Sequence, residues 1–480
     1  METSRPSSQC KILGGIQLTR VLLVGSGARE HAIASALVRS TSVKLYAAMS
    51  SRNPGIIKLA RDAQVMKIAD VKVVLAYASR IRAELVVVGP EEPLVNGLVD
   101  AFTRIGIPSV GPTRCLALLE GDKAFCRELL ERHGIEGNPS FQVFTEAIHA
   151  ENYLKKSGPV AIKPVGLTSG KGVKVTGEDL PTKESEIRYA KEILQNRIGG
   201  VKKLVVEEKL EGEEYSVQAF VDGRNVHVLP PVQDHKRAYD GDIGPNTGGM
   251  GSYSDHDHML PFLSKQDLEF STRLMSEVVD ALRVETGQLY KGILYGQFML
   301  SRNSNEERLR PRLIEFNCRF GDPEVMNVLS ILSENTDFAE ICERIANGNL
   351  NSKHPKFEER ATVCKYLVPD GYPRNAAAGE TILVDEGAIA REGACCFYAG
   401  VDLDGGRVVT TTSRTIGLVG IGGTLQEAER ICERAVSHVK GPLRHRKDIG
   451  TVALVQKRIE HIRALEQSNR LITQPQVHVT

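Results

Sequence analysis

The sequence predicts a mixed α/β protein with three consecutive regions, and three observations support that class. Short apolar runs alternate with helical stretches in the first part of the chain, which is typical of a parallel sheet. The middle part contains alternating strands and a hairpin signal, which indicate antiparallel pairing. A length of 480 residues is too great for one hydrophobic core and fits roughly three domains.

The first region begins with an apolar run at residues 21–24, which suits a strand buried on both faces. A glycine-containing turn at residues 25–27 and a helix follow it. A second buried strand is predicted at residues 85–88, where the run ends at Gly89-Pro90. We therefore expect a parallel α/β domain over residues 21–120, preceded by a tail of residues 1–20.

The middle region is expected to span residues 121–350. Residues 160–163 and 173–176 alternate between apolar and polar side chains, as half-buried strands do. Asp222-Gly223 lies between two further strand-like runs and is a strong hairpin-turn signal.

The last region is expected to be a small α+β domain over residues 355–450. It contains short strands at residues 400–411 and 417–423, and then a helix at residues 425–439. A charged helix is predicted over residues 453–466, with residues 467–480 as a tail.

Composition excludes several classes of protein. The chain has 61 basic and 60 acidic side chains, so its charge gives no reason to expect nucleic acid or a membrane as a partner. Nine cysteines without a C-x-x-C pair fit a reducing compartment better than a disulfide framework. No apolar stretch approaches the ~20 residues that span a bilayer, and the N-terminus has no secretory signal. We expect a cytoplasmic enzyme.

The loop between the two predicted strands at residues 160–176 could hold an anion. Gly166, Gly170 and Gly172 allow backbone N–H groups to approach a ligand closely, and Lys163 and Lys171 add positive charge. It is not a Walker A loop, because glycine follows Lys171 where that motif needs serine or threonine. A flexible hairpin turn with solvated lysines is the alternative.

A second group of polar residues lies in the predicted strand that ends near residue 317. Glu315 and Asn317 are two residues apart and share a face, and their oxygens suit Mg²⁺. Asp322-Pro323 is expected to cap and open a helix. Arg319 would then lie between this strand and a helix N-terminus, where an anion can bind. The alternative is an edge strand whose polar residues face water.

A basic cluster at residues 234–237, which includes Lys236, precedes a glycine-rich loop at residues 244–251. Such a loop beside basic side chains could close over a phosphorylated ligand, or it could be an ordinary surface loop.

Nine short motifs in this order resemble the ATP-grasp ligases, and among them the phosphoribosylamine–glycine ligase family. The resemblance runs from residue 21 to about residue 450 and weakens after residue 355. The motifs are VGSGAREHA (24–32), VVGPEEPLV (87–95), LEGDKAF (119–125), KPVGLTSGKGV (163–173), VEEKLEGEE (206–214), QDHKR (233–237), GPNTGGMGSY (244–253), IEFNCRFGDPE (314–324) and RKDIG (446–450).

The resemblance implies an ATP-grasp fold with a mobile lid at about residues 145–215. It also implies the ligation of glycine to 5-phosphoribosylamine through a glycyl phosphate, with ADP, phosphate and glycinamide ribonucleotide as products of this purine-biosynthetic step. ATP would be the co-substrate, with Mg²⁺ or Mn²⁺. The partners would be these small molecules, with no nucleic acid and no membrane.

The resemblance also implies a role for each residue that matches a family motif. The adenine hinge at residues 207–210 would act through its backbone, and either Glu213 or Glu214 would reach the ribose. Gln297 stands where related enzymes often have a further metal ligand. The implied catalytic residues are Lys163, Lys236 and Arg319; the ATP-binding residues are Lys123, Lys163, Gly170, Lys171, Gly172, Glu207, Leu210, Glu213 and Glu214; the substrate-binding residues are Gly27, Asn246, Thr247, Gly248, Gly249, Met250, Arg319 and Asp322; and the metal ligands are Glu315, Asn317 and Gln297.

Two further patterns do not indicate the functions that they first suggest, although the resemblance implies that the turn at residues 25–27 helps to hold the ribose-phosphate amine. Residues 25–30 look like a dinucleotide fingerprint, but Glu30 occupies the place of its third glycine. Residues 255–258 alternate aspartate and histidine, and we interpret them as a solvated loop. Two other functions stay open: a different ATP-grasp carboxylate–amine ligase, or a nucleotide-binding regulator without turnover.

Overall fold

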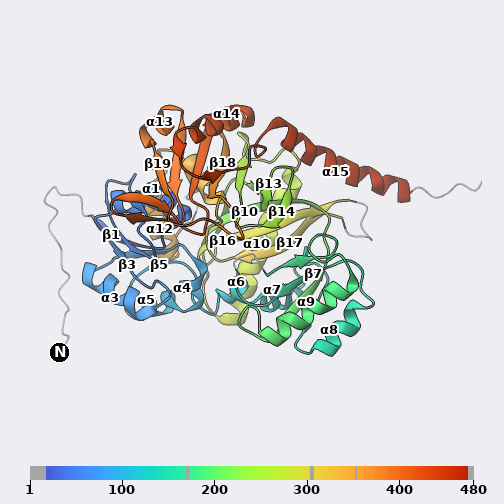
Figure 1. The fold of residues 1–480 in the computed structure, drawn as a ribbon. Coiled ribbons are helices and arrows are strands. Elements are labelled where there is room, and N and C mark those ends of the chain that lie inside the picture. The colour runs from blue at the N-terminus through green and yellow to red at the C-terminus, as the bar shows by residue number, and fades with distance from the viewer. Residues whose placement is uncertain (1–17, 169–171, 303–307, 352–353, 474–480) are drawn as a thin grey trace, which may run out of the picture.

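The computed structural model describes residues 18–168, 172–302, 308–351 and 354–473. The predicted parallel α/β domain is present, at the left of Figure 1, with strand order β3-β2-β1-β4-β5 and every neighbouring pair parallel. β1 begins at Thr19, two residues before the predicted start. The elements are β1 (Thr19–Val24), α1 (Ala28–Leu37), β2 (Val43–Met49), α2 (Pro54–Leu59), β3 (Asp62–Val65), α3 (Val71–Ile81), β4 (Leu85–Val88), α4 (Glu91–Val95), α5 (Leu98–Arg104) and β5 (Ser109–Val110).

A small unit at residues 141–208, which we call the lid unit, has its own antiparallel sheet of order β6-β9-β7-β8. Its apolar core, formed by side chains such as Ile162 and Ile193, is separate from the main core of the molecule. The elements here are α6 (Leu118–Gly121) and α7 (Lys123–Arg132), which precede the unit, and β6 (Phe141–Phe144), α8 (Ala147–Leu154), β7 (Val160–Pro164), β8 (Lys174–Val175), α9 (Lys183–Asn196) and β9 (Leu204–Glu208).

The central sheet is antiparallel and has the order β11-β10-β16-β17, as the alternation in the middle region predicted. The predicted hairpin joins β10 to β11, but its loop has four residues, 222–225, because Val221 pairs with Val226. Helix α10 packs against β16, and α12 against β10. The elements are β10 (Gly212–Asp222), β11 (Val226–Val228), β13 (Arg237–Tyr239), β14 (Ile243–Asn246), α10 (Lys265–Thr286), β16 (Lys291–Ser301), β17 (Arg310–Asn317), α11 (Glu324–Ser330) and α12 (Phe338–Asn347).

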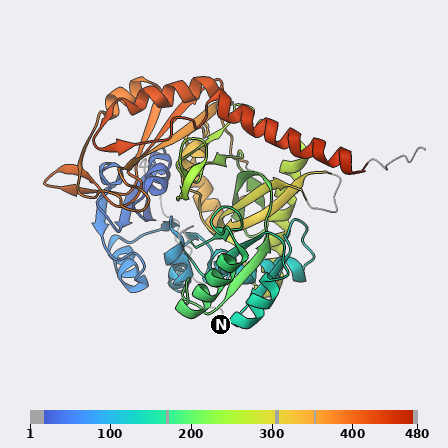
Figure 2. The same cartoon turned by 45° about the vertical axis from the view of Figure 1, so that its right-hand side comes forward.

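The last domain is built on a six-stranded sheet that includes two strands from the middle of the chain. Its order is β12-β15-β18-β23-β20, and β25 also pairs with β18. Figure 2 shows this domain, in orange, above the first domain. The elements are β12 (Gln233–Asp234), β15 (Gly251–Ser254), β18 (Ala361–Pro369), β19 (Thr381–Val384), α13 (Glu386–Arg391), β20 (Ala394–Tyr398), β21 (Val401–Asp404), β22 (Arg407–Thr410), β23 (Ile416–Gly422), α14 (Leu425–Val436), β24 (Val439–Lys440), β25 (Leu443–Arg444) and α15 (Val452–Thr473).

Three helix boundaries differ from the sequence predictions. The helix after Arg319 begins at Glu324 with Pro323 as its N-cap, so Asp322 is not the cap; its carboxylate pairs with Arg414 instead. The helix predicted at residues 425–439 ends at Val436. The last helix, α15, extends to Thr473 and so covers part of the expected tail. Among the described helices, none is long and apolar enough to cross a membrane.

Candidate active site

One face of the central sheet carries a row of polar side chains. Gln297 in β16 lies opposite Ser216 in β10 and opposite Glu315 in β17, so the three point the same way. Asn317, two residues beyond Glu315, shares this face, as the alternation predicted. Burial opposes charge on Glu315, but nearby cations, Lys236 foremost, keep the pKa of its carboxyl below the usual range. The face therefore presents ionised and amide oxygens together.

Lys236, two residues after β12, has its ammonium group at this face. Its Nζ is 2.8 Å from Oε2 of Glu214, and Nε2 of Gln297 donates to the same oxygen at 3.0 Å and to Asp234 Oδ1 at 3.3 Å. Burial alone would lower the pKa of Lys236, but the carboxylates of Glu214 and Asp234 raise it above its usual value. Lys236 is therefore a permanent cation at this face.

Lys163 belongs to a buried ionic cluster at the base of the lid unit. Its Nζ is 2.7 Å from Oε2 of Glu207, and Arg127 forms a two-pronged pair with the same carboxylate at 2.8 and 2.9 Å. Lys163 and Arg127 also donate to the carbonyl of Ile314, at 3.1 and 2.7 Å. Lys163 is only 4% exposed, which contradicts the alternative of a solvated lysine at this position.

Both carboxylate oxygens of Glu207 are paired with Arg127 and Lys163 within this cluster. Burial works against its charge, but Arg127 and Lys163 hold the pKa of its carboxyl below the usual range. Its side chain is therefore not available to ATP, and the implied contact would be made by the backbone of Glu207 as part of the hinge that ends at Leu210. Arg127 is a residue that the sequence analysis missed, because its partner lies 80 positions away.

The glycine-rich loop above Lys163 is only partly described, and Gly170 and Lys171 lie outside the described residues. A methyl group on Gly166 would lie 1.9 Å from the carbonyl oxygen of Gly199, so close packing requires this glycine whatever the loop binds. A methyl group on Gly172 would lie 2.7 Å from the Thr168 hydroxyl. Lys123 begins α7, and its Nζ donates to the Gly166 carbonyl at 3.1 Å, which places its charge at the loop.

The structure separates the two candidate ribose ligands, Glu213 and Glu214. Glu214 lies on the polar face with Lys236. Glu213 points to the opposite side of β10, where its Oε1 is 2.6 Å from Nδ1 of His461 in α15 and its Oε2 is 3.4 Å from Arg458. Glu213 therefore anchors the last helix, and only Glu214 faces the site.

Arg319 is held by acceptors from three parts of the chain. Its guanidinium lies 3.2 Å from Glu91 and 3.0 Å from Glu120, and it donates to Oδ1 of Asn317 at 2.8 Å. Burial opposes ionisation of the Glu91 carboxyl, but the charges of Arg319 and Arg29 lower its pKa to about 2. Glu120 is more deeply buried, and burial raises its pKa to about 7. The acidic residues that follow it in the chain have other partners: Asp322 pairs with Arg414, and Glu324 accepts from Tyr295.

A polar cavity of about 220 Å³ lies between the first and last domains. Gly27, the N-cap of α1, lines it together with Arg414, which was not among the residues predicted from the sequence. The residue in the place of the third fingerprint glycine, Glu30, accepts from the Gly27 N–H at 2.6 Å, so it fills the turn itself. The lining residues are Ser26, Gly27, Ser50, Ser51, Asp322, Ala399, Gly400, Thr411, Ser413 and Arg414.

The loop at residues 244–250 meets this cavity through Arg414. Nη1 of Arg414 donates to the carbonyls of Gly248 and Gly249 at 2.6 and 2.9 Å, and Thr247 donates through its hydroxyl to the Lys236 carbonyl at 2.8 Å. Met250, in contrast, has a fully buried side chain, and its N–H donates to the carbonyl of His235. Met250 therefore packs the loop onto the core, which contradicts its predicted contact with substrate.

Asn246, at the end of β14, pairs with Arg237 across the hairpin, on the approach to this loop. The aspartate–histidine run stays outside the site. Asp255, His256 and Asp257 bring possible ligand atoms within 4.8 Å of one another, but two of the three side chains are exposed and the carboxylate of Asp255 pairs with His256 at 3.0 Å.

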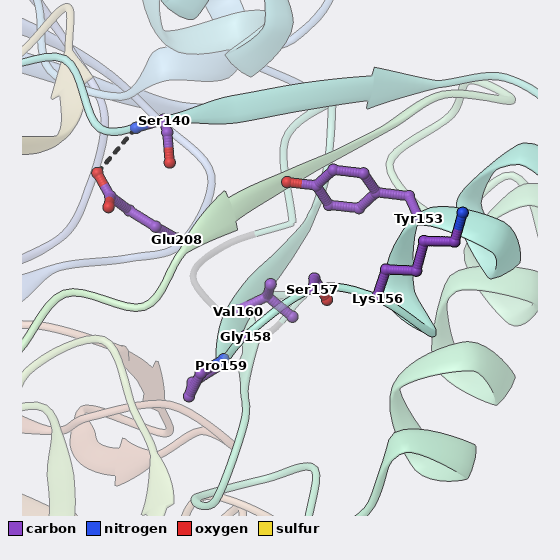
Figure 3. Close-up of a pocket in the computed structure, with 8 residues that line it drawn as sticks. All are labelled: Ser140, Tyr153, Lys156, Ser157, Gly158, Pro159, Val160 and Glu208. Carbon is purple, nitrogen blue, oxygen red and sulfur yellow. Dashed lines mark hydrogen bonds between the residues drawn. The ribbon is translucent and has the colours of Figure 1, made fainter.

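A larger cavity, of about 390 Å³, lies at the outer end of the lid unit (Figure 3). Figure 3 shows the Tyr153 hydroxyl pointing towards Ser140 and Glu208, and the Glu208 carboxylate accepts from the Ser140 N–H at 2.8 Å. Of the predicted ligand residues, this cavity is lined by Glu208 of the adenine hinge alone, and it lies apart from the polar face of the central sheet.

A lid unit over a polar sheet face with buried lysines defines an ATP-grasp enzyme. Residues 121–325 match the ATP-grasp (A) domain of phosphoribosylglycinamide synthetase, and residues 19–120 and 362–452 match its N and C domains. The chain belongs to the phosphoribosylglycinamide synthetase family.

Curated relatives and solved structures agree with this assignment. The phosphoribosylamine–glycine ligases of Methanothermobacter thermautotrophicus and Methanocaldococcus jannaschii are 48% and 46% identical to this chain. Each alignment covers 93% of this chain, and 99% and 100% of the relative. The Thermotoga maritima phosphoribosylamine–glycine ligase structure superposes with a TM-score of 0.74 at 29% identity, over 90% of this chain and all of that one. A biotin carboxylase domain from Hydrogenobacter thermophilus, with MgADP and bicarbonate, shares the fold at a TM-score of 0.69 and 16% identity, over 94% and 95% of the two chains.

Proposed function

We propose that this chain joins glycine to 5-phosphoribosylamine in purine biosynthesis, with glycyl phosphate as the intermediate and ADP and phosphate as products. One observation carries the proposal: the cation Lys236, the oxygens of Glu315 and Asn317, and the guanidinium of Arg319 meet on one face beside the polar cavity. Family membership supports the choice of substrates.

ATP would lie between the lid unit and the central sheet. Lys123 and Lys163 would contact its phosphates, and the backbone from Glu207 to Leu210 would contact its adenine. Glu214 is the carboxylate placed to reach the ribose. Phosphoryl transfer depends on positioning and charge neutralisation more than on a covalent nucleophile, and these cations supply both.

The oxygens on the polar face fit a divalent cation. Glu315 and Asn317 provide hard donors, which suit Mg²⁺ or Mn²⁺. Gln297 fits less well as it stands, since its Oε1 lies against the Tyr295 hydroxyl and its Nε2 is turned towards Glu214 and Asp234. Asn317 Oδ1 accepts from Arg319, so it would bind an ion through its other lone pair. A bound ion would neutralise charge on the ATP phosphates.

Arg319 would receive the glycine carboxylate. As a carboxylate oxygen of glycine attacks the γ-phosphorus, the bond from that phosphorus to ADP breaks, and negative charge spreads over the transferred group. A guanidinium held by Glu91, Glu120 and Asn317 needs little reorganisation to meet that charge.

The cavity between the first and last domains suits the phosphorylated ribose. It offers the hydroxyls of Ser26, Ser50 and Ser51 at the ends of parallel strands, which is where ligands bind to such sheets, and the charge of Arg414. We place the reaction in the cytoplasm, because every cysteine in the described part of the chain is a free thiol, as in reducing compartments.

The test is ATP consumption by the purified chain with glycine and freshly generated phosphoribosylamine, and with each substrate omitted in turn. We expect turnover only in the complete mixture with a divalent metal. Turnover with another amine and not with phosphoribosylamine would identify a different ligase. ATP binding without turnover in any mixture would identify a regulator.

A further inference from the structure

The second half of the proposed reaction needs a proton acceptor. The amine nitrogen of phosphoribosylamine attacks the carbonyl carbon of glycyl phosphate, a C–N bond forms, and the bond from that carbon to the phosphate oxygen breaks. The nitrogen lone pair forms the new C–N bond and leaves the nitrogen positively charged. The nitrogen must therefore lose a proton to give the amide. A positioned carboxylate can take it at the site of attack.

Glu324 is a buried carboxylate next to the polar face. It is the first residue of α11 and is only 2% exposed. Its Oε1 accepts from the Tyr295 hydroxyl at 2.8 Å, and Tyr295 lies in β16 opposite Asn317. A methyl group on Gly321 would lie 2.4 Å from Oε2 of Glu324, so glycine at 321 leaves room for this oxygen.

The charged neighbours of Glu324 come from both halves of the site. Asp234 and Lys236, from the phosphate side, act electrostatically on its carboxyl. On the cavity side, the charge of Glu324 contributes to raising the pKa of Arg414. Asp322, two residues before Glu324, lines the cavity and pairs with Arg414 at 2.9 Å. Through Tyr295, opposite Asn317, and through Asp322, Glu324 is therefore close to both the polar face and the cavity.

We infer that Glu324 is the catalytic base that takes the proton from the amine of phosphoribosylamine as it attacks glycyl phosphate. This inference rests on the proposed function. Burial, reinforced by repulsion from Asp234, raises the pKa of Glu324 to about 7, which suits a base that works near neutral pH.

The experiment separates the two halves of the reaction in wild type and Glu324→Gln. The first half is followed without phosphoribosylamine, by glycine-dependent positional exchange of ¹⁸O from the β,γ-bridge of labelled ATP. The same half is also followed by trapping glycyl phosphate with hydroxylamine, a weakly basic amine that is neutral at neutral pH and loses its proton readily. Complete ligation is measured as glycinamide ribonucleotide formed.

Glu324→Gln keeps the shape of the side chain and removes the base. We expect ligation to fall about 10²–10⁴-fold, the usual contribution of general base catalysis, while isotope exchange and hydroxamate formation stay within about threefold of wild type. Ligation within about threefold of wild type would overturn the inference. A parallel loss of all three activities would overturn it too, because Glu324 would then serve the first half.

Glu324→Asp keeps a carboxylate but withdraws it by one methylene, and it provides a second test if the glutamine variant folds poorly. We expect ligation intermediate between wild type and Glu324→Gln, with normal hydroxamate formation. Aspartate no better than glutamine, with both variants folded by melting temperature, would contradict a role as base. No glycine-dependent exchange in the wild type would contradict the acyl-phosphate proposal itself.

Discussion

Arg319 shows at the scale of one residue how the site is assembled. Its carboxylate partners, Glu91 and Glu120, come from α4 and from α6, and Asn317 is the last residue of β17, two positions before it. A planar guanidinium can satisfy several acceptors at fixed angles, whereas an ammonium is a point charge. The geometry therefore calls for arginine and not merely for positive charge.

We expect Arg319→Lys to lower kcat by about 10²–10³-fold and to leave the KM for ATP nearly unchanged, because a preorganised donor is lost where charge develops. Steady-state kinetics with varied ATP and glycine provide the measurement. A lysine variant within about threefold of wild type would leave Arg319 with a structural role only.

We expect Glu315→Ala to abolish turnover with the fold intact, because the change removes a hard oxygen donor from the polar face. Activity is measured over a range of Mg²⁺ concentrations, and circular dichroism checks the fold. Arg310→Ala, at the exposed start of the same strand, is the matched control and should keep wild-type activity. Near-normal turnover of the Glu315 variant at low Mg²⁺ would refute the metal assignment.

The sequence allowed some of these residues to be placed, and the reason is local. Glu315 and Asn317 share a face because strands alternate, and that rule needs only two positions of sequence. Glu213 and Glu214 could not be separated, because the choice depends on α15, which returns from far along the chain. Arg414 was missed for the same reason, since 92 positions separate it from Asp322.

At the scale of elements, helix α1 and strand β20 meet through a buried histidine. Nδ1 of His31 accepts from the Tyr398 N–H at 3.0 Å, and its ring stacks on that of Tyr398. A methyl group on Gly55 would lie 2.0 Å from the His31 ring, so α2 closes the third side. Burial lowers the pKa of His31 to about 4. The charge of Lys58 also lowers this pKa, whereas the carboxylate of Glu386 raises it.

This contact predicts acid sensitivity. The unfolded chain binds a proton at His31 near pH 6.5 and the folded chain only near pH 4, so stability falls as pH drops through that window. We expect His31→Gln to be less stable than wild type at neutral pH and to lose less stability on acidification. The measurement is the melting temperature of both proteins between pH 7.5 and 4.5. An equal dependence of melting temperature on pH in the two proteins would contradict the role of His31.

Element types were easier to predict than element partners. The parallel sheet, the β10–β11 hairpin and the last helix follow from periodicity and turn residues, which are local signals. The sheet that β12 and β15 join could not be predicted in this way, because the sequence of a short strand does not indicate which strand it pairs with. The start of α11 was misplaced by one residue, since Asp322 pairs with Arg414 and does not cap the helix.

At the scale of the whole molecule, the lid unit has its own core and lies against a body that holds the polar face and the cavity (Figures 1 and 2). In the proposed function, such an arrangement would enclose the terminal phosphates of ATP between Lys163 and the oxygens of β17. It favours transfer of the γ-phosphoryl group over transfer of the adenylyl group.

We therefore expect ADP and inorganic phosphate as products, in equal amounts with glycinamide ribonucleotide. Phosphorus NMR of a complete reaction mixture distinguishes them from AMP and pyrophosphate. Formation of AMP would mean that glycine is activated by adenylation, and the glycyl-phosphate route would be wrong.

The last domain is not a detachable module. Residues 251–254 of β15 pair along β18 from Thr362 to Lys365, so the middle of the chain supplies part of the sheet on which that domain is built. A gene cut near residue 355 would leave an open edge on β18 in one fragment and on β15, still paired with β12, in the other. Open edges recruit foreign strands, so both fragments would tend to aggregate. Transplanting or replacing the C-terminal third of this enzyme therefore requires residues 233–254 to travel with it.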